Sequence, residues 1–544
     1  MPSIDRRQFL QTGVAGGVGI AASRIAGAGG ANAEAASLVV EVSPFDLQEA
    51  TLVDLQKKMQ TGEESARSLV EKYRRRIEAL DRQGPALHAV IELNPEADDI
   101  AARLDAERTS KGPRGPLHGI PVVIKDNIGT ADRMTTTAGS LALEGSTPAR
   151  DAFVARRLRE AGAIILGKTN LSEWANFRST HSSSGWSGRG GQAKNPYALD
   201  RNPSGSSSGT AIAVAASFAA VGIGTETDGS IVSPANNCGL VGLKPTIGLV
   251  SRAGIIPIAH SQDTAGPMAR TVTDAAILLG ALVGADPDDR VTVAGAAKGR
   301  RDYTTFLDPN ALKGARIGVP RKACFGMSLP ADRIVEEAIA VLRKLGAVIV
   351  DPAELPPASK VSDSEFTVLT CEFKADLNAY LAGLGPKAPA HSLQDLIAFN
   401  DRNKDREMPY FGQDIFLETE KAAPLTDPKY KAALANGHQW TRTLGIDAVA
   451  AKYRLDAFVA PTSGPASLTD LVNGDHGPNG CSTFAAVAGY PHVTVPAGFA
   501  FGLPVGLSFF GPAFTEGKLL GYAFAFEQAT RHRWPPRFLP TVEV

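Results

Sequence analysis

The stretch from Asn202 to Pro245 constrains the chain most strongly, because it sets two serines in glycine surroundings on either side of an uncharged apolar run. Ser206 lies within Gly-Ser-Ser-Ser-Gly, and Ser230 follows Thr-Asp-Gly. Residues 210–221 between them are small or apolar, which predicts a buried helix that the preceding hydroxyls cap. A short strand over 222–225 and a turn at the Asp-Gly pair follow. This path of loop, helix, strand and tight loop can bring the two hydroxyls to one place.

Such an arrangement suits acyl transfer. A nucleophile must attack a carbonyl carbon while backbone N–H groups receive the developing oxyanion, and glycines let the backbone approach closely. A Gly/Ser-rich stretch is also typical of a flexible linker. Linkers, however, do not enclose an apolar run like residues 210–221. The spacing alone leaves both interpretations open.

The same stretch resembles the signature of the amidase signature family, serine hydrolases that use a Ser–Ser–Lys triad in place of Ser–His–Asp. Further agreement lies at residues 119–126, GIPVVIKD, and at residues 167–173, GKTNLSE, and weaker agreement runs to the C-terminus. The resemblance implies an α/β fold in which a central mixed β-sheet is covered by helices. It also implies that residues 34–544 form one large amidase domain.

The resemblance assigns roles to individual residues. It implies that Ser230 is the nucleophile, that Ser206 is the bridging serine whose peptide bond is cis in the family, and that Lys125 is the base. The family's oxyanion loop falls on Thr227, Asp228, Gly229 and Ser230. The mechanism that these residues imply requires no metal ion and no organic cofactor.

Lys125 has to be largely neutral to act as a base, whereas a free lysine, with a pKa of about 10.4, is protonated at neutral pH. Burial lowers a lysine pKa, and the apolar run 120–124 is consistent with a buried position. Asp126 would oppose this shift unless an extended backbone turns the two side chains to opposite faces. The residues alone also allow a structural lysine paired with a carboxylate. Lys168 and Lys244, which follow similar apolar stretches, then compete equally, and only the resemblance selects Lys125.

The rest of the chain alternates predicted helices, such as 63–80 and 151–161, with short apolar strands, such as 120–124 and 163–166. This alternation predicts an α/β fold with a largely buried sheet. Residues 351–424 are richer in charge and proline and are interpreted as a helical insertion on the rim of the sheet. Such a segment either shapes a substrate entrance or packs on the surface.

Residues 1–33 resemble a twin-arginine export signal. A pair of arginines precedes Phe9-Leu10, a weakly apolar glycine-rich run follows, and Ala-Asn-Ala at 31–33 forms a cleavage site. A disordered basic tail is the alternative. The signal predicts export to the periplasm or the medium. No later stretch approaches the roughly 20 apolar residues of a membrane span, so we expect no stable membrane insertion.

The net charge of −1 gives no indication of a nucleic-acid partner. The four cysteines are far apart without a C-x-x-C pair, which argues against a zinc site. An oxidising compartment would allow one disulfide bond, but the sequence does not indicate which cysteines would form it. The oligomeric state is likewise not indicated by the sequence.

The form ETDGSIV at 226–232, together with GKTNLSEWANF at 167–177, is similar to bacterial peptide amidases. Those enzymes remove ammonia from the C-terminal carboxamide of a peptide without cutting internal peptide bonds. The similarity predicts a short peptide amide or a related small molecule as substrate. Many members of the family have glycine at the position of Asp228, and this difference is part of the similarity to the peptide amidases. In the alternative interpretation, Asp228 only stabilises the loop through local hydrogen bonds. A general aliphatic or aryl amide hydrolase is the alternative activity, and an exported binding protein on an amidase scaffold is the alternative outside enzymes.

Overall fold

The computed structural model describes residues 43–476 and 480–543, so the predicted export signal lies outside the described residues. The strands of its main sheet are β1 (Val90–Leu93), β2 (Pro121–Lys125), β3 (Ile164–Thr169), β6 (Val221–Glu226), β7 (Val241–Lys244), β8 (Thr264–Ala269), β9 (Arg316–Gly318), β10 (Val348–Val350), β11 (Ala457–Pro461), β12 (His492–Ala500) and β13 (Leu503–Phe510). They lie side by side in the order β1-β3-β2-β6-β8-β7-β12-β13-β11-β9-β10. A separate small ribbon pairs β4 (Trp186–Ser187) with β5 (Gly191–Gln192).

The sheet is mixed. Strands β3, β2 and β6 run parallel to one another, whereas β8 pairs antiparallel with β6. Every residue of β2, β3, β6 and β8 is buried, without the alternation of a half-exposed sheet. Both faces of these strands are therefore covered, as is usual for the sheet of an α/β domain. The sheet confirms the predicted mixed α/β architecture.

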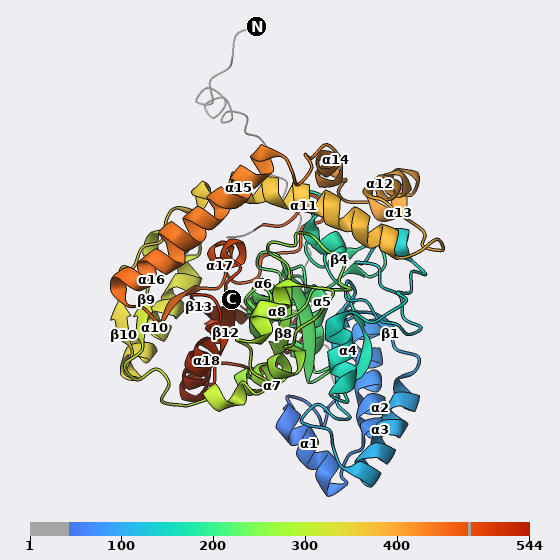
Figure 1. Ribbon diagram of the computed structural model, residues 1–544. Helices are drawn as coiled ribbons and strands as arrows, with labels where there is room; N and C mark the ends of the chain where they lie inside the picture. The colour runs from blue at the N-terminus through green and yellow to red at the C-terminus, as the bar shows by residue number, and fades with distance from the viewer. Residues whose placement is uncertain (1–42, 477–479, 544) are drawn as a thin grey trace, which may run out of the picture. The chain divides into compact units, whose positions relative to one another are not determined.

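Helices surround the sheet (Figure 1). They are α1 (Leu52–Thr61), α2 (Ala66–Ile77), α3 (Ala97–Lys111), α4 (Phe153–Glu160), α5 (Ser208–Ala215), α6 (Val232–Asn237), α7 (Val272–Leu282), α8 (Val291–Ala296), α9 (Arg321–Cys324), α10 (Leu329–Lys344), α11 (Ser362–Gly383), α12 (Leu393–Arg402), α13 (Lys404–Glu407), α14 (Asp414–Glu420), α15 (Pro428–His438), α16 (Asp447–Tyr453), α17 (Thr483–Ala488) and α18 (Glu516–Thr530). Among the described helices, none is both long and apolar enough to span a membrane.

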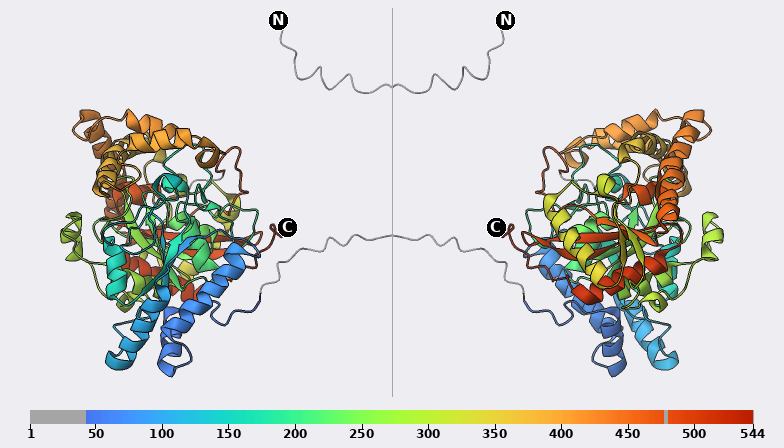
Figure 2. Two further views of the ribbon diagram at one scale, coloured as in Figure 1. Left: turned by 90° about the vertical axis from the view of Figure 1, so that its right-hand side faces the viewer. Right: turned by 90° about the vertical axis from the view of Figure 1, so that its left-hand side faces the viewer.

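Local sequence explains where these helices begin. The Ser65 side chain accepts a hydrogen bond from the N–H of Ser68 at the start of α2, and Ser68 returns one, which forms a capping box. Leu69, Val70 and Tyr73 then bury one face of α2 against the core. Helices α1–α3 lie at the end opposite α11–α15, which both views in Figure 2 show as blue and orange ribbons.

Helices α11–α14 fall within the predicted insertion 351–424, and the helical part continues beyond it with α15 and α16. Phe373 and Leu377 of α11 and Phe416 of α14 belong to a second hydrophobic cluster. The cluster also contains Trp174 and Phe177, which follow β3 in the chain and make aromatic edge contacts with Phe416 and Phe373. The helices therefore pack directly over the residues that lead from β3 toward the signature stretch.

A buried ion cluster strengthens the same junction. The guanidinium of Arg178 lies 2.6 Å from Glu173 Oε1 and 3.7 Å from Glu407 Oε2, and all three side chains are fully buried. Glu407 closes α13, whereas Glu173 and Arg178 follow β3. Glu407 also accepts a hydrogen bond from the N–H of Leu141 at 2.6 Å. One carboxylate of the helical insertion thus pairs with two separate segments of the sheet domain.

The signature stretch differs in detail from the expected helix and cap. Helix α5 ends at Ala215 because Ser217 takes a left-handed backbone conformation with φ of 59°, so the predicted helix over 210–221 is too long. The predicted cap is wrong. The Ser207 hydroxyl donates to the carbonyl oxygen of Thr225 at 3.1 Å and accepts from its N–H at 3.2 Å. The Ser207 hydroxyl therefore pairs with two buried backbone groups of β6, and not with an N–H group at the start of α5.

All four cysteines are buried, and Cys324 and Cys481 hydrogen-bond to each other. Cys238, Cys324, Cys371 and Cys481 are all unpaired and buried. No disulfide joins them in the described chain.

Candidate active site

Lys125 ends strand β2, which lies between β3 and β6, and is fully buried. Its Nζ donates to Ser206 Oγ at 2.7 Å and to Thr225 Oγ1 at 3.0 Å. Burial lowers the pKa of Lys125 to about 7, although Asp263 and Glu226 nearby favour the charged form. The amine is therefore neutral in a large fraction of molecules at neutral pH, and it already contacts a serine hydroxyl.

The other two buried lysines make different contacts. Lys168 Nζ donates to the carbonyl oxygen of Ile128 and to Thr136 Oγ1, both at 2.7 Å. Lys244 Nζ donates to the carbonyl oxygen of Pro245 at 3.1 Å. Burial lowers the pKa of both to about 8, but their hydrogen bonds do not reach Ser206 or Ser230. The contacts of their amines therefore distinguish the three lysines, which the sequence alone does not.

Asp126 points away from the Lys125 amine, as an extended backbone requires. Its Oδ2 accepts from the Thr137 hydroxyl and from the N–H of Gly139, and it lies 3.6 Å from the Arg189 guanidinium. These partners occupy the other face of the strand. Asp126 consequently does not hold Lys125 in its charged form.

Ser206 is fully buried, and the Gly205–Ser206 peptide bond is cis. The carbonyl oxygen of Ser206 accepts a hydrogen bond from the N–H of Ser172 at 3.2 Å. A Cβ at Gly205 would lie 2.2 Å from Ser172 Oγ, so this position has room only for glycine. Tight packing on both sides holds the Ser206 hydroxyl against Lys125.

The loop after β6 carries the other predicted residues. Gly229 has a φ of 78°, a left-handed conformation that favours glycine. Among the hydrogen bonds of the described residues, the N–H groups of Asp228, Gly229 and Ser230 have no acceptor. Ser230 is almost completely buried and follows directly. Free N–H groups beside a serine are what stabilisation of an oxyanion requires.

Glu226 is a site residue that the sequence reasoning missed. Its Oε2 accepts hydrogen bonds from the N–H groups of Ile231 at 2.7 Å and Val232 at 3.0 Å, just after Ser230. The carboxylate therefore fixes the residues that follow the nucleophile position. The signal was present in the sequence, because Glu226 is the only charge in the apolar strand that leads into the loop.

Ser206 and Ser230 line one cavity of about 210 Å³. Its wall is largely apolar and comes from a segment that the sequence reasoning did not single out, with Ala253, Ile255, Ile256, Pro257 and Ile258. Charged side chains line the same cavity, namely Arg252, His260, Asp263, Asp288, Asp289 and Asp376. The arrangement offers an apolar space beside two buried hydroxyls, with ionic groups around it.

A second, polar cavity lies on the other side of the loop and is lined by Asp228 and Gly229. Asp228 Oδ2 accepts from the Thr483 hydroxyl at 2.7 Å, a partner remote in sequence, while its Oδ1 is buried without a partner in the described chain. Glu365 lines this cavity too. Burial, and then the neighbouring Asp228 carboxylate, raise the pKa of Glu365 well above its ordinary range.

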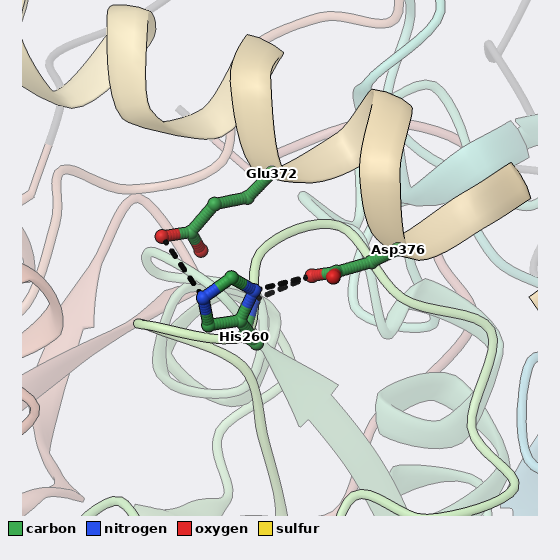
Figure 3. Close-up of side chains that lie close together, drawn as sticks. All are labelled: His260, Glu372 and Asp376. Carbon is green, nitrogen blue, oxygen red and sulfur yellow. Dashed lines mark hydrogen bonds and ion pairs between the residues drawn. The ribbon is translucent and has the colours of Figure 1, made fainter. Parts of the chain in front are cut away.

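One group of side chains in the described residues has a composition that could hold a metal ion. His260, Glu372 and Asp376 offer ligand atoms that lie within 4.8 Å of one another (Figure 3). Each nitrogen of the His260 ring, however, faces an oxygen of a different carboxylate. This is the geometry of an ion pair with a protonated ring.

Known proteins identify the family. The family model for amidases matches residues 68–520. A probable amidase of Arabidopsis thaliana is 44% identical over 508 residues, which cover 91% of this chain and 93% of that protein. The native peptide amidase from Stenotrophomonas maltophilia is 51% identical, with a TM-score of 0.86 and coverage of 91% of this chain and 100% of that chain.

A further structure, of a peptide amidase in complex with the competitive inhibitor chymostatin, is also 51% identical and covers 90% of this chain and 100% of that chain, with a TM-score of 0.86. The family match spans most of the chain and includes the strands and loops that bear Lys125, Ser206 and Ser230. The chain therefore belongs to the amidase signature family and is an enzyme that hydrolyses amide C–N bonds.

Proposed function

We propose that the protein releases ammonia from the C-terminal carboxamide of short peptides, with Lys125, Ser206 and Ser230 as its catalytic triad. The observation that carries this proposal is the 2.7 Å contact between Lys125 Nζ and Ser206 Oγ, fully buried beside the cavity that Ser230 also lines. The likeness to the peptide amidase of Stenotrophomonas maltophilia supports the substrate class.

In the first half of the reaction, neutral Lys125 accepts a proton from Ser206 while Ser206 accepts the proton of Ser230. Ser230 Oγ then attacks the carboxamide carbon. The oxyanion is stabilised by the free N–H groups of the loop 227–230, where one such donor is worth about 3 kcal/mol of barrier. The relay returns its proton to the departing nitrogen, which leaves as ammonia. An ester between the acyl group and Ser230 remains.

In the second half, a water molecule takes the place of ammonia. The same relay removes a proton from the water, which attacks the ester carbon, and Ser230 recovers its proton as the acid leaves. A lysine base suits this cycle because its pKa of about 7 allows it both to accept and to return a proton near neutral pH. Burial of Lys125 is therefore the physical origin of its basic role.

Asp228 supports a peptide amide over a simple aryl amide. Its buried Oδ1 accepts no hydrogen bond from an N–H group of the described chain, its side chain neighbours the Glu365 carboxyl group, and it lines the polar cavity next to the nucleophile loop. A carboxylate oxygen in that position is an acceptor for a peptide N–H, which benzamide does not offer beyond its reacting group. We assign to Asp228 the recognition of the peptide backbone next to the carboxamide.

The test measures ammonia release by a protein that lacks residues 1–33, with a C-terminally amidated dipeptide, free glutamine and benzamide as substrates. Fast release from the dipeptide amide alone supports a peptide amidase. Equal or faster release from glutamine or benzamide would be compatible with the assigned triad but would contradict the proposed peptide amide substrate. It would favour a general amide hydrolase.

Substitutions separate the parts of this proposal. Ser230→Ala and Ser206→Ala should each abolish turnover, whereas Ser208→Ala is the matched control, because the Ser208 hydroxyl bonds only to the carbonyl oxygen of Ser204. Asp228→Asn should raise KM for the dipeptide amide and leave KM for benzamide unchanged, since an amide nitrogen then faces the peptide N–H. Turnover retained in Ser230→Ala would overturn the assigned nucleophile.

We also propose that residues 1–33 direct export of the enzyme through a twin-arginine pathway, and that residues 34–544 form the mature amidase. The paired arginines Arg6 and Arg7 before an apolar run support this proposal. Replacing both arginines by lysine should keep the enzyme in the cytoplasm of a bacterial host. Unchanged activity in the periplasmic fraction would contradict it.

A further inference from the structure

One face of helix α11 carries three carboxyl side chains, those of Glu365, Glu372 and Asp376. Their spacing of seven and four residues places them one above another along the helix. All three contact the short segment 260–263, which precedes β8 and lines the cavity beside Ser230. Helix α11 therefore touches the site through this segment.

His260 is the centre of this contact. Its Nδ1 lies 2.8 Å from Asp376 Oδ2, and its backbone N–H donates to the same oxygen at 3.1 Å. Its Nε2 faces Glu372 Oε1 at 3.5 Å. Figure 3 shows the imidazole ring between the two carboxylates, which project from neighbouring turns of one helix.

Glu372 is the anchored partner, because it is fully buried and makes further hydrogen bonds. Its Oε2 accepts from the N–H of Ser261 at 2.8 Å, and its Oε1 accepts from the Tyr430 hydroxyl on α15 at 2.8 Å. Two helices thus hold the carboxylate in place. The segment 260–263 consequently has a fixed position relative to α11.

The other end of the segment reaches the loop that bears Ser230. Gln262 Nε2 donates to Glu365 Oε1 at 2.9 Å and to the carbonyl oxygen of Thr227 at 3.4 Å. Asp263 Oδ1 accepts from the Thr227 hydroxyl at 2.6 Å. A continuous set of hydrogen bonds therefore runs from α11 through residues 260–263 to Thr227, the first residue of the loop with free N–H groups.

We infer that His260, held between Glu372 and Asp376, is a positioning residue that fixes the oxyanion loop 227–230 through the segment 260–263. This inference rests on the proposed role of that loop in catalysis. It gives helix α11 of the insertion a part in the reaction, although α11 supplies no group that touches the reacting atoms. His260 also lines the cavity, but it reaches the oxyanion loop through Gln262, Asp263 and Thr227.

The charged groups that face His260 are Asp376 and Glu372 from α11 and Arg252 from the loop that precedes His260. Arg252 is itself paired with Asp289. The hydrogen bond with Asp376, and then the charge of Glu372, raise the pKa of His260 above its ordinary value of 6.5, while burial and Arg252 oppose them. A raised pKa means that the ion pair is complete at lower pH and is lost as pH rises through the raised value. The ion pair of His260 with Glu372 and Asp376 therefore weakens as the pH rises.

The experiment measures kcat and KM of the enzyme lacking residues 1–33 from pH 6 to pH 10 in the wild type and in His260→Gln and His260→Arg. His260→Gln should lower kcat about tenfold, change KM little and remove the alkaline fall in kcat, because misplaced catalytic donors cost rate. His260→Arg keeps a cation between the carboxylates, which the half-exposed site has room for. It should therefore retain kcat and lose only the alkaline fall.

A second variant keeps the test valid if His260→Gln does not fold. Asp376→Asn removes the main cause of the raised pKa, so the alkaline fall should move to lower pH. His391→Gln is the matched control, since His391 is exposed on the same insertion and is not part of the cavity wall. It should behave as the wild type.

Three results would overturn the inference. They are a wild-type pH profile in His260→Gln, an equal loss in His391→Gln, and loss of activity on chelation that zinc restores, which would make the trio a metal site. Failure of the proposed function is distinguishable, because it would appear as turnover in Ser230→Ala whatever His260 does.

Discussion

Replacing Lys125 by methionine should abolish turnover and, at the same time, make the protein more stable. The two effects have one cause, because the amine that serves as the base is held in a site that disfavours its charged form. Methionine has a similar length, carries no charge and suits a buried position. A lysine with a purely structural role would give the opposite result for stability.

The magnitude follows from the pKa. The difference between the ordinary value of 10.5 and about 7 corresponds to about 5 kcal/mol at about 1.4 kcal/mol per pKa unit. Methionine forgoes the hydrogen bonds with Ser206 and Thr225, which contribute about 1 kcal/mol each. We expect a net increase of about 2–3 kcal/mol in the free energy of unfolding near pH 7.

The sign of the pH dependence is fixed by the two pKa values. Between pH 7 and pH 10.5 the unfolded chain binds a proton on this lysine that the folded protein lacks, so wild-type stability rises with pH across that window. Methionine has no such proton. The advantage of Lys125→Met should therefore be complete below about pH 7 and should shrink toward pH 10.5.

Urea unfolding at pH 6.5 and at pH 10, with ammonia release measured in parallel, tests both effects. Lys244→Met is the matched control, because it removes a buried lysine that does not contact Ser206 and should keep turnover. A Lys125→Met protein that is less stable at both pH values, or that still turns over substrate, would refute the reasoning.

Three further predictions concern the same site and its support. On its acid side, the ratio kcat/KM should rise with pH up to about 7, because Lys125 acts only when neutral, and a profile that is flat from pH 5 to pH 7 would contradict this. Glu226→Gln should lower kcat and cost about 1–3 kcal/mol of stability, measured by kinetics and urea unfolding, because the N–H groups of Ile231 and Val232 lose the carboxyl oxygen of Glu226 as their acceptor. Arg178→Met should lower the free energy of unfolding by about 3–5 kcal/mol, since the fully buried Glu173 and Glu407 side chains lose the cation that they contact, and an unchanged melting temperature would contradict it.

The sequence predicted most central strands, because their apolar runs are short and bounded by polar or glycine residues. Strand β2 was expected at 120–124 and is observed at Pro121–Lys125. Two strands near the middle of the sheet, β7 and β8, are not predicted by the sequence. Strand β8 contains Gly266 and Pro267, and a proline argues against a central strand. Gly266 is required at its position, because a Cβ there would lie 2.0 Å from the carbonyl oxygen of Leu243.

The choice of site residues came from the family resemblance and not from local sequence. Lys125 could not be chosen over Lys168 and Lys244 from local sequence, because all three end apolar stretches and all three are buried. Their difference lies in which hydroxyl each amine reaches. The roles of His260 and Glu372 were out of reach for the same reason, since their contact spans residues far apart in the chain and follows from how α11 packs.

The buried pairing of Arg178 with Glu407 has a consequence for how enzymes of this kind diversify. The insertion that carries Glu407 looks like a removable module, yet its deletion would leave Arg178 in an apolar interior with only Glu173 as counter-ion. Exchange of this segment between relatives therefore succeeds only if Arg178 and Glu173 travel with it or are replaced together. The insertion and the interior beneath it are therefore coupled through buried charged groups, so a change in one requires a compensating change in the other.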